Sequence, residues 1–239
     1  MDVIASRKNR NVRMMRDLLR DINYRREIGF FAVEGDHLCG ELADCVDTEL
    51  YAVYFLYTEK AAKKYPETVK KVLEKAYFSA VITEELSEYI SDTKSPQGLF
   101  MATEMFWVKI PENARRIVVL DNVQDPGNVG TIIRAAEAFS IDGVLLFGFC
   151  ADQFSPKTLR ASMGSVFRIP IRSAYYIEED LKKTLGGFTV YGAMLDDTAK
   201  RLGEVAFPEK TAIVIGSEGR GISPGVAEIC DEKIYIPIK

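Results

Sequence analysis

The chain has 239 residues, which exceeds the roughly 100–200 residues of a common domain and favours two domains over one. Hydrophobic residues make up 47% and charged residues 28%, an ordinary globular composition that argues against collagen-like, disordered and disulfide-rich proteins. The formal net charge of −4 does not by itself indicate a nucleic-acid partner. No apolar run approaches the roughly 20 residues of a membrane helix, and no secretory signal follows Met1, so we expect a cytoplasmic protein.

Cysteine and histidine are sparse, which restricts the possible chemistry. The four cysteines show no Cys-x-x-Cys spacing, so we expect reduced, mostly buried thiols and neither a zinc site nor a disulfide framework. They are Cys39, Cys45, Cys150 and Cys230. The single histidine, His37, is predicted to be structural or exposed. We therefore expect no metal site built on histidine, although carboxylates could hold magnesium.

The first segment of the chain is strongly basic. Residues 7–26 contain eight basic and two acidic side chains, and apolar residues recur at helical spacing. The apolar set is Val12, Met15, Leu19 and Ile22, and the basic candidates for RNA binding are Arg7, Lys8, Arg13, Arg16 and Arg20. Two interpretations stay open: a face that binds a phosphate backbone, or an ordinary solvated helix face.

The first half alternates predicted strands and helices. Strands are predicted at 30–35, 50–57 and 80–82, and helices at 37–45, 60–76 and 84–90. This βαβα order favours a small α/β sandwich over residues 1–104. Residues 105–116 contain Pro111 and no clear period, so we predict a linker there and a second domain over 117–239.

The second half predicts a parallel α/β sheet covered on both faces. The apolar run 117–120 reads as a central strand, followed by a glycine-rich turn, a helix at 131–139 and a strand at 143–147. Further strands are predicted at 166–171, 188–193, 211–215 and 233–238.

Two glycine-rich loops are candidates for a ligand site, because ligands of parallel sheets bind beyond the carboxyl ends of the strands. In the first, Asn128 begins the predicted helix and Arg134 follows six residues later, which we expect to place both near one helix mouth. In the second, three glycines surround Glu218, and so open a backbone suits a nucleoside. Neither loop fits a Walker A or a G-x-G-x-x-G pattern, which disfavours kinases and ordinary dehydrogenases. Taken singly, each could be only a tight βα turn.

Taken together, the motifs resemble a known family. DPGNVG with RAA (125–136), SPK with RASMG (155–164), GSEGRG (216–221) and IP (236–237) are similar in order and spacing to the SpoU (TrmH-like) RNA 2'-O-ribose methyltransferases of the SPOUT superfamily. This resemblance covers the second half. The first half is more weakly similar to an L30e-like substrate-binding domain, through residues 6–9, 31–35 and 95–98. The implied fold is an L30e-like sandwich followed by a parallel-sheet trefoil-knot domain.

The resemblance implies roles for individual residues. Arg134 would lie at the ribose hydroxyl, with Asn128 and Glu218 completing the catalytic group and Glu218 orienting one of the other two. S-adenosyl-L-methionine would be contacted at Ile215, Gly216, Gly221 and Ile236. Arg160 would touch RNA or the partner subunit of a homodimer, or would be only a surface residue. Because a guanidinium keeps its proton in water, we expect Arg134 to stabilise developing alkoxide charge while the substrate phosphate or a water accepts the proton.

One family motif is not found. A Ser-Leu-Asn segment follows the Ile-Pro pair in the family, whereas this sequence is given up to Lys239. We therefore expect a truncated chain that, in this form, binds cofactor weakly, leaves the knot incomplete and dimerises poorly.

The leading functional hypothesis is methyl transfer to a ribose 2'-hydroxyl, most of all in ribosomal RNA and at unpaired nucleotides. Transfer RNA is the next substrate. Two alternatives from other classes are a non-catalytic RNA-binding protein that has lost the cofactor site and a nucleotide-binding Rossmann enzyme.

Overall fold

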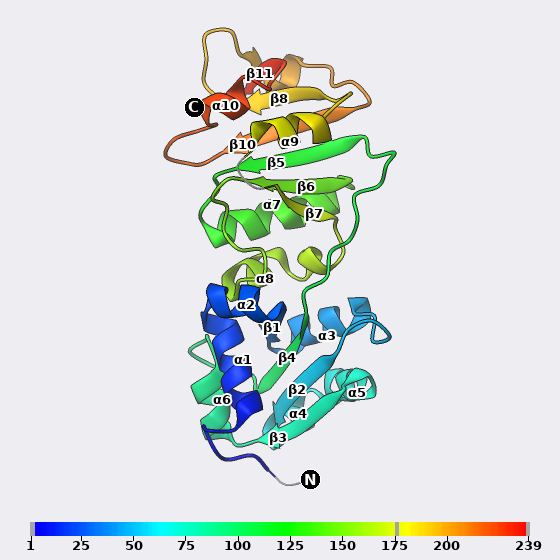
Figure 1. The fold of residues 1–239 in the computed structure, drawn as a ribbon, viewed down its shortest axis with the longest axis vertical. Coiled ribbons are helices and arrows are strands. Elements are labelled where there is room, and N and C mark those ends of the chain that lie inside the picture. Colours follow the sequence, from blue (N-terminus) through cyan, green and yellow to red (C-terminus); the bar gives the residue numbers. More distant parts are fainter. Residues whose placement is uncertain (1–2, 175–176, 238–239) are drawn as a thin grey trace. The chain divides into compact units, whose positions relative to one another are not determined.

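The computed structural model describes residues 3–174 and 177–237 and divides the chain into two compact units. The first unit runs to Phe106 and also includes residues 154–167, and the second consists of residues 107–153 and 168 onward (Figure 1). The first change of unit falls in the predicted linker. The sequence does not predict that residues 154–167 pack with the first unit.

The first unit is a mixed α/β structure. Its elements are α1 (Arg10–Arg20), α2 (Ile22–Ile28), β1 (Phe30–Glu34), α3 (Asp36–Cys45), β2 (Val53–Thr58), α4 (Glu59–Lys64), α5 (Pro66–Lys75), β3 (Phe78–Ile82), α6 (Glu84–Ile90), β4 (Leu99–Glu104), α8 (Pro156–Ser162) and the 3-10 helix Ser165–Phe167. The sheet order is β1-β4-β2-β3, with β4 antiparallel to both neighbours and β2 parallel to β3. Val12 and Met15 of α1 and Ile90 of α6 belong to one buried cluster with Leu56 and Phe100 of the sheet.

Two predicted helices of this unit are interrupted, and each break has a local cause. The basic helix ends at Arg20 because Asp21 is extended, and the Asp21 carboxylate accepts the N–H groups of Asn23 and Tyr24 to begin α2. The predicted helix 60–76 divides at Tyr65, because Pro66 has no N–H to donate inside a helix and instead occupies the first turn of α5.

Among its described residues, the second unit contains a sheet of seven parallel strands, which confirms the predicted fold class. Its elements are β5 (Arg116–Asp121), α7 (Pro126–Ala138), β6 (Gly143–Phe147), β7 (Ile171–Ala174), α9 (Glu178–Thr184), β8 (Thr189–Ala193), β9 (Lys200–Arg201), the 3-10 helix Leu202–Glu204, β10 (Thr211–Gly216), α10 (Pro224–Ala227) and β11 (Glu232–Tyr235). The order is β7-β6-β5-β10-β8-β11-β9, and every pair is parallel. Since β10 lies between β5 and β8, the direction of strand progression reverses between β5 and β10.

Three predicted boundaries in the second half were wrong. The strand predicted at 166–171 is instead a 3-10 helix followed by β7, which begins at Ile171 directly after Pro170. Helix α7 begins at Pro126 rather than at 131, because the Asp125 carboxylate caps it by accepting the Asn128 N–H at 3.0 Å. Strand β11 ends at Tyr235, and residue 238 of the predicted strand lies outside the described residues.

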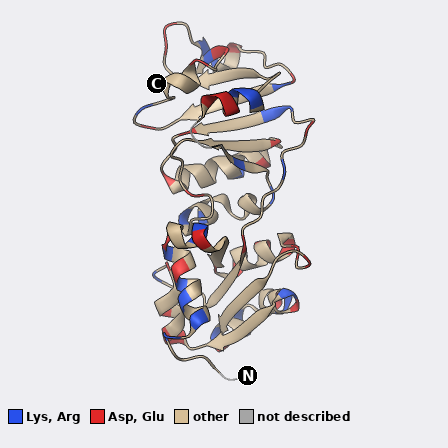
Figure 2. Ribbon diagram, in the orientation of Figure 1, with Lys and Arg blue, Asp and Glu red and all other residues tan. Residues whose placement is uncertain are grey.

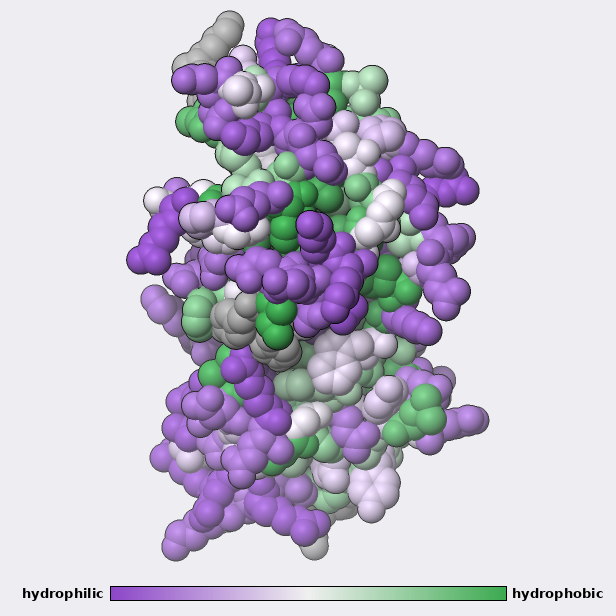
Figure 3. Space-filling view, turned by 45° about the horizontal axis from the view of Figure 1, so that its top comes forward, coloured by the Kyte–Doolittle hydropathy of each residue, from purple (hydrophilic) through white to green (hydrophobic). Residues whose placement is uncertain are grey.

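The surface is mainly hydrophilic on the face shown in Figure 3, with smaller apolar patches between the polar side chains. Among the described residues, no helix is long and apolar enough to cross a membrane. None of the four cysteines forms a disulfide; Cys39 is buried and the other three are partly buried. His37 is exposed in the first turn of α3, where the sequence predicts a helix.

Candidate active site

The two glycine-rich loops meet at one edge of the parallel sheet. Strands β5 and β10 are neighbours, and Gly216 at the end of β10 is in register with Asp121 at the end of β5. The loops that follow them therefore leave the carboxyl edge side by side, where the strand order reverses. Such a switch point is the usual ligand site of an open parallel sheet.

The loop after β10 folds back into a tight turn. Ser217 and Gly221 exchange backbone hydrogen bonds of 3.1 and 2.9 Å, which leaves Glu218 exposed at the tip. Gly221 has a φ of +66°, in the left-handed region that favours glycine. A Cβ atom on Gly216 would lie 2.2 Å from the carbonyl carbon of Gly221. Position 216 therefore requires glycine, because the backbone of Gly221 comes too close for a side chain there.

A side-chain hydrogen bond joins the two loops. The Asn128 amide, in the first turn of α7, donates to the Glu218 carboxylate, and both residues are exposed. The sequence leaves open whether Glu218 orients Arg134 or Asn128. In the structure, Glu218 contacts Asn128.

Arg134 takes a different position from the one expected for it. Six residues of helix separate it from Asn128 by about 120° around the axis and about 9 Å along it, so the two side chains leave different faces of α7. Arg134 is exposed and forms no hydrogen bond or ion pair with any residue that the structure describes. Its guanidinium is consequently available to a ligand.

A buried carboxylate that the sequence analysis missed organises this edge. Asp121 is fully buried; its Oδ1 accepts the Asn122 side-chain amide at 2.6 Å and its Oδ2 accepts the Ser223 N–H at 2.5 Å. The Asn122 Oδ1 in turn accepts the Phe149 N–H at 2.9 Å. Asp121 and Asn122 thus tie together the loops after β5, β6 and β10. The available signal was an Asp-Asn pair that directly follows an apolar strand.

The thiol of Cys150 lies against this cluster and is not a nucleophile. Its Sγ donates to the carbonyl oxygens of Leu120 and Phe147, at 3.2 and 3.3 Å. Burial raises the pKa of the Cys150 thiol to about 11. The thiol therefore stays protonated at neutral pH.

A pocket of about 540 Å³ opens at the same edge. It is lined by Asn122, Gln124, Phe149 and the turn 217–224, which includes Gly221. The volume is within the usual range of small-molecule sites.

Three of the four predicted cofactor residues lie at the carboxyl ends of β10 and β11, which are separated in the sheet by β8. Ile215 and Gly216 end β10, and Ile236 follows β11 with 66% of its surface exposed. Leu195, which the sequence did not single out, follows β8, the strand between β10 and β11, and is 90% exposed. The available signal was an apolar residue two positions after a predicted strand and directly before Asp196.

These residues fit S-adenosylmethionine in chemical terms. Exposed apolar side chains at Leu195 and Ile236 suit the faces of a purine, and the glycine-rich backbone beside them offers N–H and C=O groups to polar atoms. The segment after Leu195 is held in place because Lys233 Nζ contacts the Asp196 carboxylate at 2.7 Å. The hydrogen bond from Lys233 is the main reason that the pKa of Asp196 lies well below its usual value.

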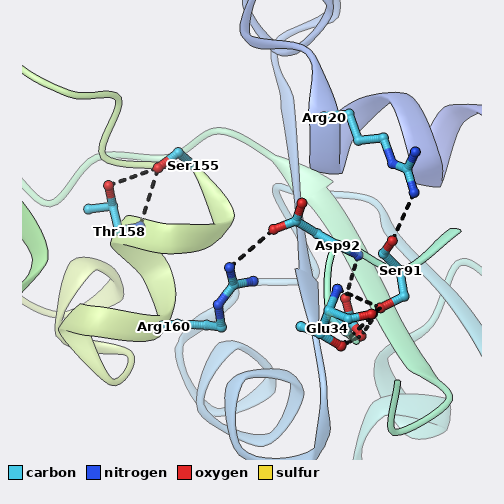
Figure 4. Close-up of polar contacts among 8 residues, drawn as sticks. Arg20, Glu34, Ser91, Asp92, Ser155, Thr158 and Arg160 are labelled. Carbon is cyan, nitrogen blue, oxygen red and sulfur yellow. Dashed lines mark hydrogen bonds and ion pairs between the residues drawn. The ribbon is translucent and has the colours of Figure 1, made fainter. Parts of the chain in front are cut away.

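Basic residues lie along α1 and just before it in the first unit (Figure 2). Arg7 pairs with Glu85 at 2.7 Å, the Arg16 guanidinium lies 4.8 Å from the centre of the Tyr89 ring, and Arg20 donates to the Ser91 carbonyl at 2.9 Å (Figure 4). Lys8 and Arg13 are exposed, and their side chains have no polar partner among the described residues. Three of the five RNA-binding residues predicted in this basic segment therefore also have partners within the first unit.

Arg160 on α8 also has a partner within the first unit. Its Nη2 lies 3.1 Å from Asp92 Oδ2, and the Asp92 N–H donates to Glu34 (Figure 4). Ser91 donates to the same Glu34 carboxylate at 2.5 Å. Arg160 therefore connects α8 to the loop that follows α6.

Comparisons with known proteins agree with this geometry. The sequence profile of the SpoU rRNA Methylase family matches residues 115–239. A Bacillus subtilis 23S rRNA (guanosine(2553)-2'-O)-methyltransferase is 31% identical over 251 aligned positions, covering 100% of this chain and 91% of its own length. An uncharacterized tRNA/rRNA methyltransferase of Synechocystis is 30% identical, covering 98% of this chain and 85% of its own.

Solved structures agree as well. An rRNA methyltransferase from Sinorhizobium meliloti superposes with a TM-score of 0.83 at 26% identity, covering 100% of this chain and 90% of its own. A structure of that enzyme with bound S-adenosylmethionine gives the same TM-score and identity. The resemblance inferred from the motifs is thereby confirmed. The chain belongs to the SpoU rRNA methylase family and is an S-adenosylmethionine-dependent RNA methyltransferase.

Proposed function

We propose that this chain transfers a methyl group from S-adenosylmethionine to a ribose 2'-hydroxyl of ribosomal RNA. The observation that carries the proposal is the Asn128–Glu218 hydrogen bond, which joins the two motif loops at the carboxyl edge of the sheet. The Bacillus subtilis relative, named as a 2'-O-methyltransferase of 23S rRNA, supports both the ribose and the ribosomal assignment.

The residues of the chain have distinct tasks in this reaction. When bound, the cofactor supplies an electrophilic sulfonium methyl group. Ile215, Gly216, Gly221 and Ile236 would hold it at the ends of β10 and β11, with Leu195 beside them. The order that they impose is itself catalytic, because positioning two reactants contributes much of the rate of a transfer reaction.

Arg134 would act on the hydroxyl. An arginine guanidinium remains charged at any pH at which the enzyme works, so it is a poor base and a good partner for developing alkoxide charge. The proton passes to a phosphate oxygen of the substrate or to water. Asn128, held by Glu218, would fix the beginning of α7 and thereby the position of the helix that carries Arg134.

Transfer to ribose is tested by supplying tritiated S-adenosylmethionine and ribosomal RNA transcripts to the protein. The label should resist removal with the bases and protect the adjoining phosphodiester from alkali. Arg134→Ala should lower the rate by about 100- to 1000-fold without changing cofactor affinity. Arg116→Ala, an exposed arginine at the opposite edge, is the matched control.

Three results would count against the proposal. Label recovered on a base would exclude ribose transfer, and an Arg134→Ala enzyme of full activity would exclude the role of that side chain. Transfer RNA methylated in preference to ribosomal RNA would replace the substrate while leaving the chemistry intact.

RNA binding by α1 forms part of the same proposal. Lys8 and Arg13 would contact phosphates, with Arg7, Arg16, Arg20 and Arg160 adding to the positive field from their fixed positions. Reversing the charge in Arg13→Glu should weaken RNA binding at low salt and reduce its salt dependence. A homodimer formed through the methyltransferase unit remains a prediction, which analytical ultracentrifugation tests.

A further inference from the structure

The pocket of about 540 Å³ at the carboxyl edge of the seven-stranded sheet contains one cationic side chain, Arg220, among its described lining residues. The loops that line it directly follow β5, β6 and β10. We propose that this pocket receives the target nucleotide of the RNA and that the Arg220 guanidinium binds the phosphate of that nucleotide. This inference rests on the proposed function, since it assigns a further contact to the same RNA substrate.

The pocket and the predicted cofactor residues lie on different sides of the turn that follows β10. In the sheet, β10 has β5 as one neighbour and β8 as the other. Leu195 and Ile236 follow β8 and β11, which are on the β8 side. The pocket is lined instead by Asn122 and Gln124 after β5, and none of its described lining residues directly follows β8 or β11. Because Gly221 belongs to both sets, a methyl acceptor in the pocket would face the cofactor across one short turn.

The turn holds the backbone of Arg220 in a fixed position. Ser217 and Gly221 exchange two backbone hydrogen bonds, and the Ser217 hydroxyl oxygen accepts the Arg220 N–H at 3.3 Å. The tip of the turn therefore consists of Glu218, Gly219 and Arg220, and all three line the pocket. A Cβ atom on Gly219 would meet nothing within 4 Å, so open space adjoins the tip. A ligand in the pocket can thus reach it.

The side chain of Arg220 is suited to an anion. It is exposed, and its guanidinium forms no hydrogen bond or ion pair with any residue that the structure describes. The one carboxylate in the described lining, that of Glu218, accepts the Asn128 amide. A guanidinium presents a planar fork of N–H donors, which binds a phosphate group through paired hydrogen bonds. The charge of the pocket therefore favours a phosphorylated ligand.

Two anions of the reaction could reach this guanidinium, a phosphate of the RNA and the carboxylate of the cofactor. Position favours the phosphate, because the pocket opens on the β5 side of the turn and the predicted cofactor residues lie mostly on the β8 side. The other polar lining groups are neutral amides and hydroxyls, at Asn122, Gln124, Ser217 and Ser223. Such groups donate to and accept from the edges of an unpaired base and the hydroxyls of a ribose. The volume also suits a ligand of the size of one nucleotide.

The phosphate contact is tested with the variants Arg220→Ala and Arg220→Lys. Affinity for a radiolabelled ribosomal RNA transcript is measured by filter binding at several salt concentrations, and affinity for S-adenosylmethionine is measured by calorimetry. Arg220→Ala should weaken RNA binding by about 10- to 100-fold, the loss of one charge-assisted contact, and should lower the slope of the salt dependence by about 0.7. Arg220→Lys should recover part of the affinity, because lysine keeps the charge without the fork. Both variants should bind the cofactor as the wild type does.

Methyl transfer gives a second measurement, and Arg116→Ala is the matched control. In Arg220→Ala the KM for RNA should rise with a smaller change in kcat, because the phosphate is held both before and during the transfer. Arg116 is an exposed arginine at the opposite edge of the sheet, so its removal should leave RNA affinity and the salt dependence unchanged.

Either of two results would overturn this inference. Equal RNA affinities and salt dependences for the wild type and Arg220→Ala would show that the guanidinium holds no phosphate. Loss of cofactor binding in Arg220→Ala with RNA affinity unchanged would assign the side chain to the carboxylate of the cofactor instead. Both results would leave ribose methylation by the wild type untouched. Conversely, a wild-type enzyme that labels a base would refute ribose transfer, and the binding measurements would still decide the role of Arg220.

Discussion

The Asp121 carboxylate accepts the backbone N–H of Ser223 at 2.5 Å, although 102 positions separate the two residues in the sequence. Asp121 ends the strand before one motif loop, and Ser223 closes the other. This contact holds the turn containing Glu218 against the beginning of the loop that leads to Asn128. Because Asp121 is fully buried, both of its oxygens depend on these internal donors.

Replacing Asp121 with asparagine should lower both stability and activity. An asparagine amide keeps only one oxygen, so its NH₂ group would face either the Ser223 N–H or the Asn122 amide, both of which need an acceptor. The free energy of unfolding should fall by about 1–3 kcal/mol. Urea titration measures the stability, and the initial rate of methyl transfer at saturating cofactor measures the activity of the folded fraction. We expect kcat to fall with little change in the KM for RNA.

Asp142 provides the matched control for this variant. Its carboxylate accepts the backbone N–H groups of Arg115 and Arg116, each at 2.8 Å, at the opposite end of β5. Asp142→Asn should reduce stability while leaving the activity per folded molecule unchanged. Equal losses of activity in the two variants would show that Asp121 acts only through general stability.

The Asn128–Glu218 pair should behave as one unit. Asn128→Ala and Glu218→Gln each weaken the hydrogen bond between the loops, so each should reduce the methylation rate, and the double variant should be no slower than the worse single variant. Both side chains are exposed, so unfolding should change by less than about 1 kcal/mol. Strictly additive losses in the double-mutant cycle would argue for independent roles.

Alanine substitution should have different effects at Gly216 and at Gly219, which belong to the same loop. A methyl group at 216 would collide with the backbone of Gly221, whereas a methyl group at 219 would meet nothing within 4 Å. Gly216→Ala should displace the turn, abolish cofactor binding in calorimetry and destabilise the protein by about 1–3 kcal/mol. Gly219→Ala should bind cofactor normally. Normal binding by both would mean that the turn does not form part of the cofactor site.

Alkaline pH should destabilise the protein through two partly buried thiols. Burial raises the pKa of Cys150 and Cys230 to about 11, above the value of about 8.5 for an unfolded thiol. The folded state thus holds these protons more tightly, and the stabilisation is complete below about pH 8.5 and is lost as the pH rises towards about 11. Urea midpoints measured across this range should fall, and Cys150→Ala should show a shallower decline. An identical pH dependence in that variant would contradict the assignment.

The sequence by itself determined the class of fold and the family. Continuous apolar runs such as 117–120 and 143–147 indicated buried parallel strands, and the spacing of the motifs indicated the methyltransferase. These signals are local, because the periods of strands and helices and the chemistry of turns depend on residues only a few positions apart. Even local features were partly missed where a single cap decides a boundary, as at Asp125 and Asp21.

Only the tertiary structure decided which distant groups meet. The contacts between Asn128 and Glu218, and between Asp121 and Ser223, exist because β10 inserts beside β5. Nothing in the hydrophobic pattern of either strand specifies that neighbour. The pairing of Arg160 with Asp92 likewise requires residues 154–167 to pack with the first unit. Strand order and packing of remote segments are settled by the burial of the whole apolar surface at once, which no short window of sequence encodes.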